Sequence, residues 1–274
     1  MKTDDFDILI IGAGISGIGI ACRLSERFPK RRIGILERRK AIGGTWDLFR
    51  YPGIRSDSDM FSYAYDLRPW LKPEILASGG EILNYLDATI DEFGIRDKIR
   101  FGHRVESADW SSEAAAWRVT AVDETSGESR EFVARFLVAC TGYYDQDQGY
   151  MPDFPGADEF AGQLVHPQHW PDDLDYSNKN VVVIGSGATA ATVVPAMAGT
   201  ASHVTMLQRS PSYFFEVPAR DFVFGTLRWV LTKRMAARFA RLRSHVLQYI
   251  LFNACRRWPK LMRRLLLRHV RKEI

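Results

Sequence analysis

The sequence predicts an α/β fold in which buried strands alternate with helices, and two observations support this class. A glycine-rich loop, Gly-Ala-Gly-Ile-Ser-Gly at residues 12–17, follows an apolar run at residues 6–11 and precedes an amphipathic stretch at residues 18–28. A second loop, Gly-Ser-Gly-Ala-Thr-Ala at residues 185–190, follows another apolar run at residues 181–184. The 274 residues, 46% hydrophobic and 26% charged, have the composition of an ordinary globular protein. Strand, glycine loop and helix in this order begin a βαβ unit, so two such units are expected.

The first βαβ unit is expected to belong to a larger sheet. Its second strand covers residues 32–36 and ends at Glu37. Residues 78–93 carry apolar side chains at helical spacing, and a turn at residues 124–128 predicts a hairpin. The strands expected after this helix lie near residues 105–110, 117–122 and 131–140.

The second unit is expected after a connector. Residues 141–180 are polar and rich in proline and glycine, which is typical of a passage between domains. A helix at residues 188–198 and a strand at residues 203–207 complete the unit. Beyond Phe222 helices are predicted, because apolar residues recur every three or four positions. These residues are Trp229, Val230, Met235, Phe239, Leu242, Val246 and Ile250.

The first glycine loop has the features of a pyrophosphate site. Gly12, Gly14 and Gly17 allow the backbone to approach a phosphate closely, and the helix N-terminus offers N–H groups and a favourable dipole. Glu37 lies where a carboxylate accepts hydrogen bonds from adenosine ribose hydroxyls. The alternative is a tight turn without a ligand. The position of the loop between a strand and a helix favours the nucleotide.

The second loop is interpreted as a site for a phosphorylated nicotinamide nucleotide. Ala190 replaces the third glycine of the loop, and that position controls only helix packing. The strand that follows ends at Arg209 and Ser210, where an acid would be expected for a ligand with a free 2′-hydroxyl. A cation and a hydroxyl there favour a 2′-phosphate, and therefore NADPH. A solvated Arg209 without a ligand is the alternative.

Charge and cysteine content exclude other kinds of site. The net charge of +4 conceals a basic region, because residues 225–274 contain fourteen Lys or Arg and a single acid, Glu273. No nucleic-acid-binding motif accompanies these bases, so no nucleic-acid partner is expected. Cys22, Cys140 and Cys255 lie too far apart in sequence for a CxxC pair, so neither a metal site nor disulfide reductase chemistry is expected.

The few, widely spaced cysteines predict a reducing cytoplasm, and the N-terminus and the hydropathy pattern predict a soluble chain. Asp4, Asp5 and Asp7 stand where a secretory signal would carry bases. No stretch reaches the roughly 18 uncharged apolar residues that a membrane-spanning helix needs.

Two longer motifs carry a resemblance to a known family. One is FxGxxxHxxxWP, matched at Phe160, Gly162, His166, Trp170 and Pro171. The other is Gly43-Gly44-Thr45-Trp46, followed by Tyr51-Pro52-Gly53 and Asp57. With these motifs the chain resembles the flavoprotein Baeyer-Villiger monooxygenases over essentially its whole length, and within them the mycobacterial ethionamide-activating subgroup. Flavin-containing monooxygenases are similar but usually have another aromatic residue at the position of Trp170.

The resemblance implies two Rossmann-like dinucleotide-binding domains, one for FAD and one for NADP. NADPH would reduce FAD, O2 would add to the reduced flavin, and the flavin peroxide would insert one oxygen atom into a small organic ketone or transfer it to a sulfide. The expected organisation is an FAD-binding part at residues 1–142, the connector at 143–180, the first βαβ unit of the NADP-binding domain at 181–224 and a basic helical region at 225–274.

The resemblance also implies the role of individual residues. Arg55, Ser56 and Asp57 would lie where flavin and nicotinamide meet, with Arg55 and Asp57 as catalytic candidates and Asp57 orienting a catalytic arginine. Phe160, Gly162, His166 and Trp170 would couple domain movement to cofactor position, in preference to acid–base catalysis by His166. The expected FAD contacts are Gly12, Gly14, Ser16, Gly17, Glu37, Gly44, Thr45, Trp46, Asp47, Leu48, Ser56, Asp57 and Val105. The expected NADP contacts are Gly185, Ser186, Gly187, Ala188, Thr189, Ala190, Arg209 and Ser210.

Family members are about twice as long, so the chain is expected to be an N-terminal half that lacks the catalytic arginine. Apolar residues of its last helices would then face water, namely Leu251, Phe252, Leu261, Leu265 and Leu266. A completing polypeptide would cover them; an anionic membrane surface is the alternative, given the bases Arg256, Arg257, Arg263, Arg264 and Arg268. A basic face on a region packed inside a larger enzyme is favoured over membrane contact. The competing functions are an N- or S-oxygenating flavin-containing monooxygenase and an inactive nucleotide-binding remnant.

Overall fold

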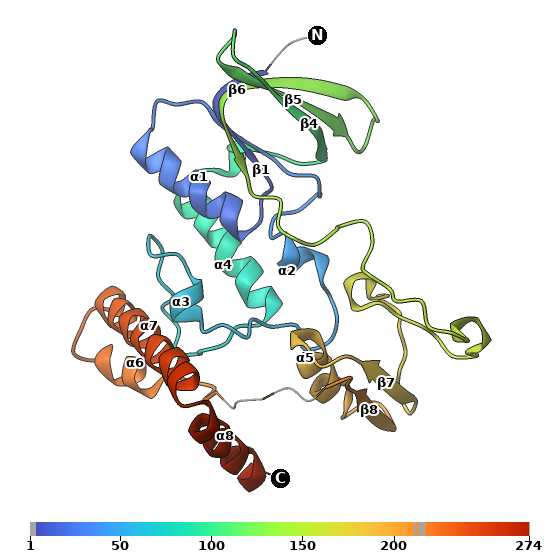
Figure 1. The fold of residues 1–274 in the computed structure, drawn as a ribbon. Coiled ribbons are helices and arrows are strands. Elements are labelled where there is room, and N and C mark those ends of the chain that lie inside the picture. Colours follow the sequence, from blue (N-terminus) through green and yellow to red (C-terminus); the bar gives the residue numbers. More distant parts are fainter. Residues whose placement is uncertain (1–3, 211–212, 214–216, 274) are drawn as a thin grey trace. The chain divides into compact units, whose positions relative to one another are not determined.

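The computed structural model describes residues 4–210, 213 and 217–273. Figure 1 shows the chain as a ribbon coloured along the sequence. Residue contacts divide it into two compact units. The first comprises Met1–Tyr51 and Gly79–Leu174, and the second Pro52–Ser78 and Asp175–Ile274. The predicted connector thus belongs, as far as Leu174, to the first unit.

The first unit is built on a six-stranded sheet with the order β3-β2-β1-β6-β5-β4. β1 lies in the middle, parallel to β2 on one side and to β6 on the other, while β4, β5 and β6 pair antiparallel. β1 ends in the fully apolar run Ile8 to Ile11, as expected of a strand covered on both faces. The strands are β1 (Asp4–Ile11), β2 (Ile33–Leu36), β3 (Ile99–Arg100), β4 (His103–Ser111), β5 (Ala116–Asp123) and β6 (Ser129–Ala139).

The helices of this unit lie at the parallel part of the sheet. α1 (Ile15–Arg27) contacts β1 and β2, and α4 (Gly79–Glu92) contacts α1. Both bury one apolar face, which for α4 consists of Ile82, Tyr85, Leu86 and Ile90. The remaining helices are α2 (Thr45–Leu48), which the sequence did not predict, and the single turns η1 (Arg96–Lys98), η2 (Ala157–Glu159) and η3 (Pro167–His169).

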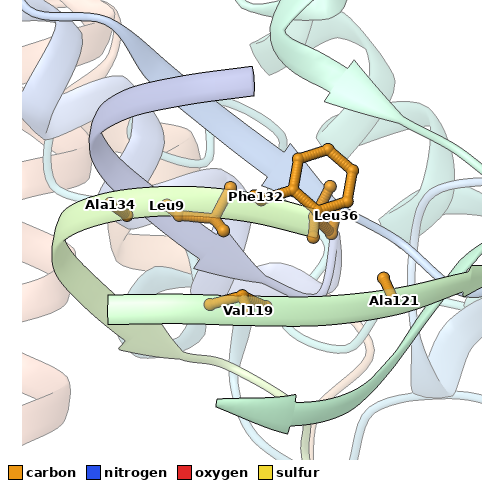
Figure 2. Packing of buried hydrophobic residues seen from close by; sticks show 6 residues of the cluster. All are labelled: Leu9, Leu36, Val119, Ala121, Phe132 and Ala134. Atoms are coloured by element: carbon orange, nitrogen blue, oxygen red, sulfur yellow. The ribbon is translucent and has the colours of Figure 1, made fainter. Parts of the chain in front are cut away.

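A core cluster joins the parallel and antiparallel parts of the sheet. It contains Leu9 of β1, Leu36 of β2 and residues of β5 and β6, and Figure 2 shows these side chains gathered between the strands. The members from β5 and β6 are Val119, Ala121, Phe132 and Ala134. Burial of this cluster fixes the register of the hairpin against β1 and β2.

The second unit contains the second βαβ motif. β7 (Asn180–Ile184) and β8 (His203–Leu207) form a two-stranded parallel sheet, and α5 (Ala188–Met197) contacts both strands. Their bounds agree with the predicted strands and helix to within a residue. Val182, Ile184 and Leu207 are exposed although parallel strands are normally covered on both faces.

Three further helices and the segment Pro52–Ser78 complete this unit. α7 (Lys233–Arg257) packs against α3 (Met60–Tyr63) and α6 (Phe222–Leu227), and the small residues Ala236, Ala237 and Ala240 allow the close contact. Arg243 of α7 forms a forked ion pair with Asp221, the residue that caps α6. The predicted helical pattern is interrupted at Trp229 and Val230, which lie in a turn before α7 begins.

The outer surface of α7 and α8 (Pro259–Glu273) combines apolar and basic side chains. Leu251, Phe252, Leu261 and Leu265 are exposed as predicted, whereas Leu266 is half-buried. The predicted bases Arg256, Arg257, Arg263, Arg264 and Arg268 are all exposed. None of the helices within the described ranges is both long and apolar enough to cross a membrane.

The core cluster leads to a stability prediction. Phe132 is 1% exposed on β6, so Phe132→Ala should lower the free energy of unfolding by about 3–5 kcal/mol through lost burial and a cavity. The matched control is Phe136→Ala on the same strand, because Phe136 is 68% exposed and its removal should change stability by about 0.5 kcal/mol or less. Urea unfolding followed by circular dichroism measures both values. Equal losses for the two variants would contradict the described core.

A second prediction concerns the thiol of Cys22 in α1. Burial raises the pKa of Cys22 to about 12, with a smaller contribution from the charge of Glu26. Because only the thiolate reacts with alkylating reagents, Cys22 should stay unmodified by iodoacetamide in the native protein at mildly alkaline pH and react after denaturation. Peptide mass spectrometry checks this. Rapid labelling of Cys22 in the native protein would show that α1 does not bury it.

Candidate functional site

Two glycines of the first loop, Gly12 and Gly17, lie directly against backbone carbonyl groups. Gly12 has a φ of +99°, and a Cβ there would lie 2.5 Å from the carbonyl oxygen of Cys140. A Cβ on Gly17 would lie 1.9 Å from the carbonyl oxygen of Gly12. Glycine is therefore required at residue 17, where α1 meets the end of β1, and at residue 12, where the end of β1 meets the end of β6.

Gly14 and Gly44 form a cradle without side chains. Gly14 precedes α1 and provides no side-chain cap, and a Cβ on it would meet the Cα of Gly44 at an ordinary 3.7 Å. Gly44 itself has a φ of +55°. Ser16 is exposed in the first turn of α1. Backbone N–H groups at a helix start, beside glycines that carry no side chain, suit a phosphate group.

Glu37 follows β2 and is 3% exposed. Its Oε2 accepts a hydrogen bond from the backbone N–H of Ala13 at 2.6 Å, and its Oε1 accepts one from the N–H of Arg39 at 2.8 Å. These bonds hold the carboxylate beside the glycine loop. Each oxygen retains a lone pair that can accept a ribose hydroxyl.

The segment after Gly44 is held by an ion pair that the sequence did not predict. Asp47 lies in α2, and its Oδ2 accepts hydrogen bonds from Nε and Nη2 of Arg39 at 2.8 and 2.6 Å. Leu48 is buried, Trp46 is half-buried and Thr45 is exposed. Arg39 therefore links Asp47 to the strand end that carries Glu37, a contact without a characteristic spacing in sequence.

Val105 lies in β4 at an irregularity in its pairing with β5. Its side chain is partly buried and packs against the core cluster. The structure therefore gives Val105 a packing contact in the first unit.

The catalytic candidates lie in the second unit. The Nε of Arg55 and the Oδ1 of Asp57 are 3.7 Å apart, and both side chains are substantially exposed. Ser56 is buried, and its hydroxyl donates to the carbonyl oxygen of Ser58 at 3.0 Å. A Cβ on Gly53 would lie 2.9 Å from the carbonyl oxygen of Thr192 in α5, so this glycine permits the segment to approach α5 closely.

The second glycine loop joins β7 to α5. Gly185 has a φ of +139°, and its N–H donates to the carbonyl oxygen of Leu207 at 2.9 Å. Gly187 precedes α5, whose first residues Ala188 and Thr189 are exposed and half-buried. Ala190 is buried in the helix, in agreement with a packing role, and Ser186 is half-buried in the loop.

Arg209 and Ser210 follow β8 and are both exposed. Arg209 forms no hydrogen bond or ion pair with any other residue in the described part of the chain. Its guanidinium is available to an anion from solvent.

The residues of FxGxxxHxxxWP lie at the end of the first unit. A Cβ on Gly162 would lie 2.4 Å from the ring of Phe160, so the aromatic ring covers this glycine. The Nδ1 of His166 accepts a hydrogen bond from the N–H of Gln168 at 3.2 Å and thereby caps η3. Trp170 follows η3 and is half-buried. Gln168, a buried residue outside the motif pattern, donates to the carbonyl oxygen of Asp145.

The described residues contain no group of three or more His, Cys, Asp or Glu side chains placed to hold a metal ion. What they do contain are two strand–glycine–helix sites with different charges at the end of the second strand. A carboxylate follows the first loop and a guanidinium follows the second.

Sequence comparison places both sites within known families. The chain matches the family described as flavin-binding monooxygenase-like over residues 69–258, and the NAD(P)-binding Rossmann-like domain over residues 10–67. It is 56% identical over 273 residues to the FAD-containing monooxygenase MymA of Mycobacterium tuberculosis, covering 98% of this chain and 55% of MymA. It is 49% identical over 266 residues to the FAD-containing monooxygenase EthA of Mycolicibacterium smegmatis, covering 97% of this chain and 54% of EthA. The chain thus spans about half the length of these relatives.

Solved structures show the same architecture. A steroid monooxygenase bound to NADP is 34% identical, with a TM-score of 0.65 over 76% of this chain and 39% of that chain. A cyclohexanone monooxygenase with bound cyclohexanone is 27% identical, with a TM-score of 0.72 over 89% of this chain and 45% of that chain. The Rossmann-like fold predicted from the sequence is confirmed. The family match and the identity to relatives together show that the chain belongs to the flavin-binding monooxygenase-like family.

Proposed function

We propose that the chain binds FAD at its first glycine loop and NADPH at its second, as part of a monooxygenase that uses O2. The observation that carries this proposal is the pairing of two strand–glycine–helix sites, one beside the buried carboxylate of Glu37 and the other beside the exposed guanidinium of Arg209. A dinucleotide with free ribose hydroxyls suits the carboxylate, and one with a 2′-phosphate suits the cation. Relatives named as FAD-containing monooxygenases, and a solved relative with both FAD and NADP, support the same assignment.

In the first site, backbone N–H groups bind the pyrophosphate of FAD, and Glu37 orients its ribose. The N-terminus of α1 faces the pyrophosphate, Gly14 and Gly44 present no side chain to it, and Glu37 accepts the ribose hydroxyls. Arg39 fixes Asp47, so that the segment Thr45–Leu48 meets the cofactor in one conformation. Reduced FAD supplies the activation of O2 when it is bound.

In the second site Arg209 and Ser210 hold the 2′-phosphate, and the loop from Gly185 to Ala190 holds the pyrophosphate. Arg55 and Asp57 are proposed to adjust the charge where flavin and nicotinamide meet, in agreement with the approach of their segment to α5 through Gly53. His166 and Trp170 are proposed to transmit movement between the nucleotide sites.

The oxygen acceptor proposed is a small organic ketone, with a sulfide as the second candidate. The ketone is supported by solved neighbours named as cyclohexanone and steroid monooxygenases. A completing polypeptide is supported by the length of the relatives and by the exposed apolar residues of α7 and α8. The alternative partner is an anionic membrane surface, which the basic residues of α7 and α8 would contact. The free cysteines Cys22, Cys140 and Cys255 agree with a reducing cytoplasm.

The cradle gives a direct test of FAD binding. Gly14→Ala places a methyl group 3.7 Å from the Cα of Gly44, an ordinary contact that the protein itself accommodates. The methyl group would lie at the loop that is proposed to bind the pyrophosphate. It should weaken FAD binding by about tenfold or more, measured by quenching of flavin fluorescence. Gly80→Ala in α4 is the matched control, because its Cβ would meet nothing within 4 Å. Unchanged FAD affinity in Gly14→Ala would place the cofactor elsewhere.

The cation at the second site predicts the choice of reductant. Arg209→Gln removes charged hydrogen bonds to the 2′-phosphate, so the dissociation constant for NADPH should rise on the order of tenfold to a hundredfold while that for NADH stays the same. Arg228→Gln, another exposed arginine of the second unit, should change neither. Titration calorimetry with both nucleotides measures these constants. An equal loss of both affinities would assign Arg209 a role in folding instead of phosphate recognition.

A further inference from the structure

Arg38, the residue after Glu37, makes a contact that no motif predicts. Its guanidinium donates to both oxygens of Asp147, from Nη1 to Oδ2 at 3.0 Å and from Nη2 to Oδ1 at 2.5 Å. Its Nε donates to Oε1 of Glu124 at 3.0 Å, an oxygen that also accepts from Nε of Arg104 at 2.8 Å. Every nitrogen of the Arg38 guanidinium is therefore engaged, and 109 residues of chain separate it from Asp147.

We call the paired hydrogen bonds from Arg38 to Asp147 the Arg38–Asp147 fork. The segment that contains Asp147, residues 145–149, also contacts the FxGxxxHxxxWP motif. The carbonyl oxygen of Asp145 accepts from the side-chain amide of buried Gln168 at 2.5 Å. A Cβ on Gly149 would lie 2.0 to 2.6 Å from three ring atoms of His166, so the imidazole rests directly on this glycine. Residues 145, 147 and 149 thus contact Gln168, Arg38 and His166 respectively.

The electrostatics of the fork distinguish it from an ordinary surface ion pair. Isolated exposed pairs contribute little, and here the side chains of Arg38 and Asp147 are 31% and 66% exposed. Exposed ion pairs contribute measurably to stability when an arginine donates two parallel hydrogen bonds to one carboxylate and when several charges form a network. Arg38 meets both conditions, because it donates to both oxygens of Asp147 and shares Glu124 with Arg104. The hydrogen bonds from Arg38 also hold the pKa of Asp147 below its usual value, and those to Asp147 raise the pKa of Arg38.

We propose that the Arg38–Asp147 fork positions residues 145–149, and through them His166 and Gln168, relative to the carboxylate of Glu37. The connector motif is thereby tied to the strand end that orients the FAD ribose. Arg38 and Asp147 are positioning residues, because they act through His166, Gln168 and Glu37. The functional part of this inference rests on the proposed FAD and NADPH sites, whereas the structural part does not.

The structural part is tested by hydrogen exchange on the whole chain. Asp147→Asn removes the charge and leaves the backbone bonds of the segment in place, so amide exchange should become several-fold faster in residues 145–149 and also in residues 166–170. Asp153→Asn is the matched control. Asp153 is an exposed acid of the same connector, and among the described residues no arginine donates paired hydrogen bonds to its carboxylate. Faster exchange confined to residues 145–149 would overturn the coupling to the motif.

The functional part is tested by the rate at which NADPH bleaches bound flavin without oxygen. Asp147→Asn should leave FAD affinity unchanged and slow this rate on the order of tenfold to a hundredfold, as expected when remote groups shift the reacting partners. Asp147→Asn should have no further effect in an Arg38→Gln background, because the charged hydrogen bonds that Asp147 accepts from Arg38 are already lost there. A wild-type rate in Asp147→Asn, or additive effects in the double variant, would overturn the proposal.

These measurements separate the failure of the two ideas. If the wild-type chain binds no FAD, the proposed cofactor assignment fails, and the exchange experiment still decides whether the fork holds the motif. If wild-type binds and reduces FAD while Asp147→Asn matches Asp153→Asn in both measurements, the cofactor assignment stands and the positioning role is wrong.

Discussion

The site depends on backbone contacts at positions where no side chain fits. Gly17 lies against the carbonyl of Gly12, and Gly12 lies against the carbonyl of Cys140, with would-be Cβ distances of 1.9 and 2.5 Å. These contacts place α1 against the end of β1, and the end of β1 against that of β6, where the N–H of Cys140 also donates to the carbonyl oxygen of Ile11 at 2.8 Å. A helix N-terminus is thereby placed at the carboxyl edge of a parallel sheet, where α/β proteins bind their ligands.

This placement also determines where the charges lie. Glu37 ends the neighbouring strand, and two backbone N–H groups hold its carboxylate in the interior. At the second site the guanidinium of Arg209 is exposed and without a partner among the described residues. A nucleotide that enters and leaves with each cycle suits an open cation, whereas a resident cofactor suits a buried and fixed carboxylate.

Much of this architecture could be predicted from local sequence. Both βαβ units, the helix of residues 79–92 and the hairpin follow from apolar periodicity and turn residues, because those signals depend on neighbours in the chain. Contacts between residues that are distant in sequence could not be predicted in this way, because they depend on the folded chain. Examples are the ion pairs Arg39–Asp47 and Arg38–Asp147, the contact of His166 with Gly149, and the grouping of Pro52–Ser78 with the second unit. The cofactor roles of Ser56, Asp57 and Val105 rest on the family resemblance alone.

The proposed function requires that one chain holds FAD and accepts electrons for it from NADPH. This is measured by titrating the FAD-reconstituted chain with NADPH in the absence of oxygen and following the visible absorption band of the flavin. The band should be bleached in proportion to added NADPH and should return when air is admitted. Retention of the band at saturating NADPH, or failure of the chain to take up FAD at all, would contradict the proposed function.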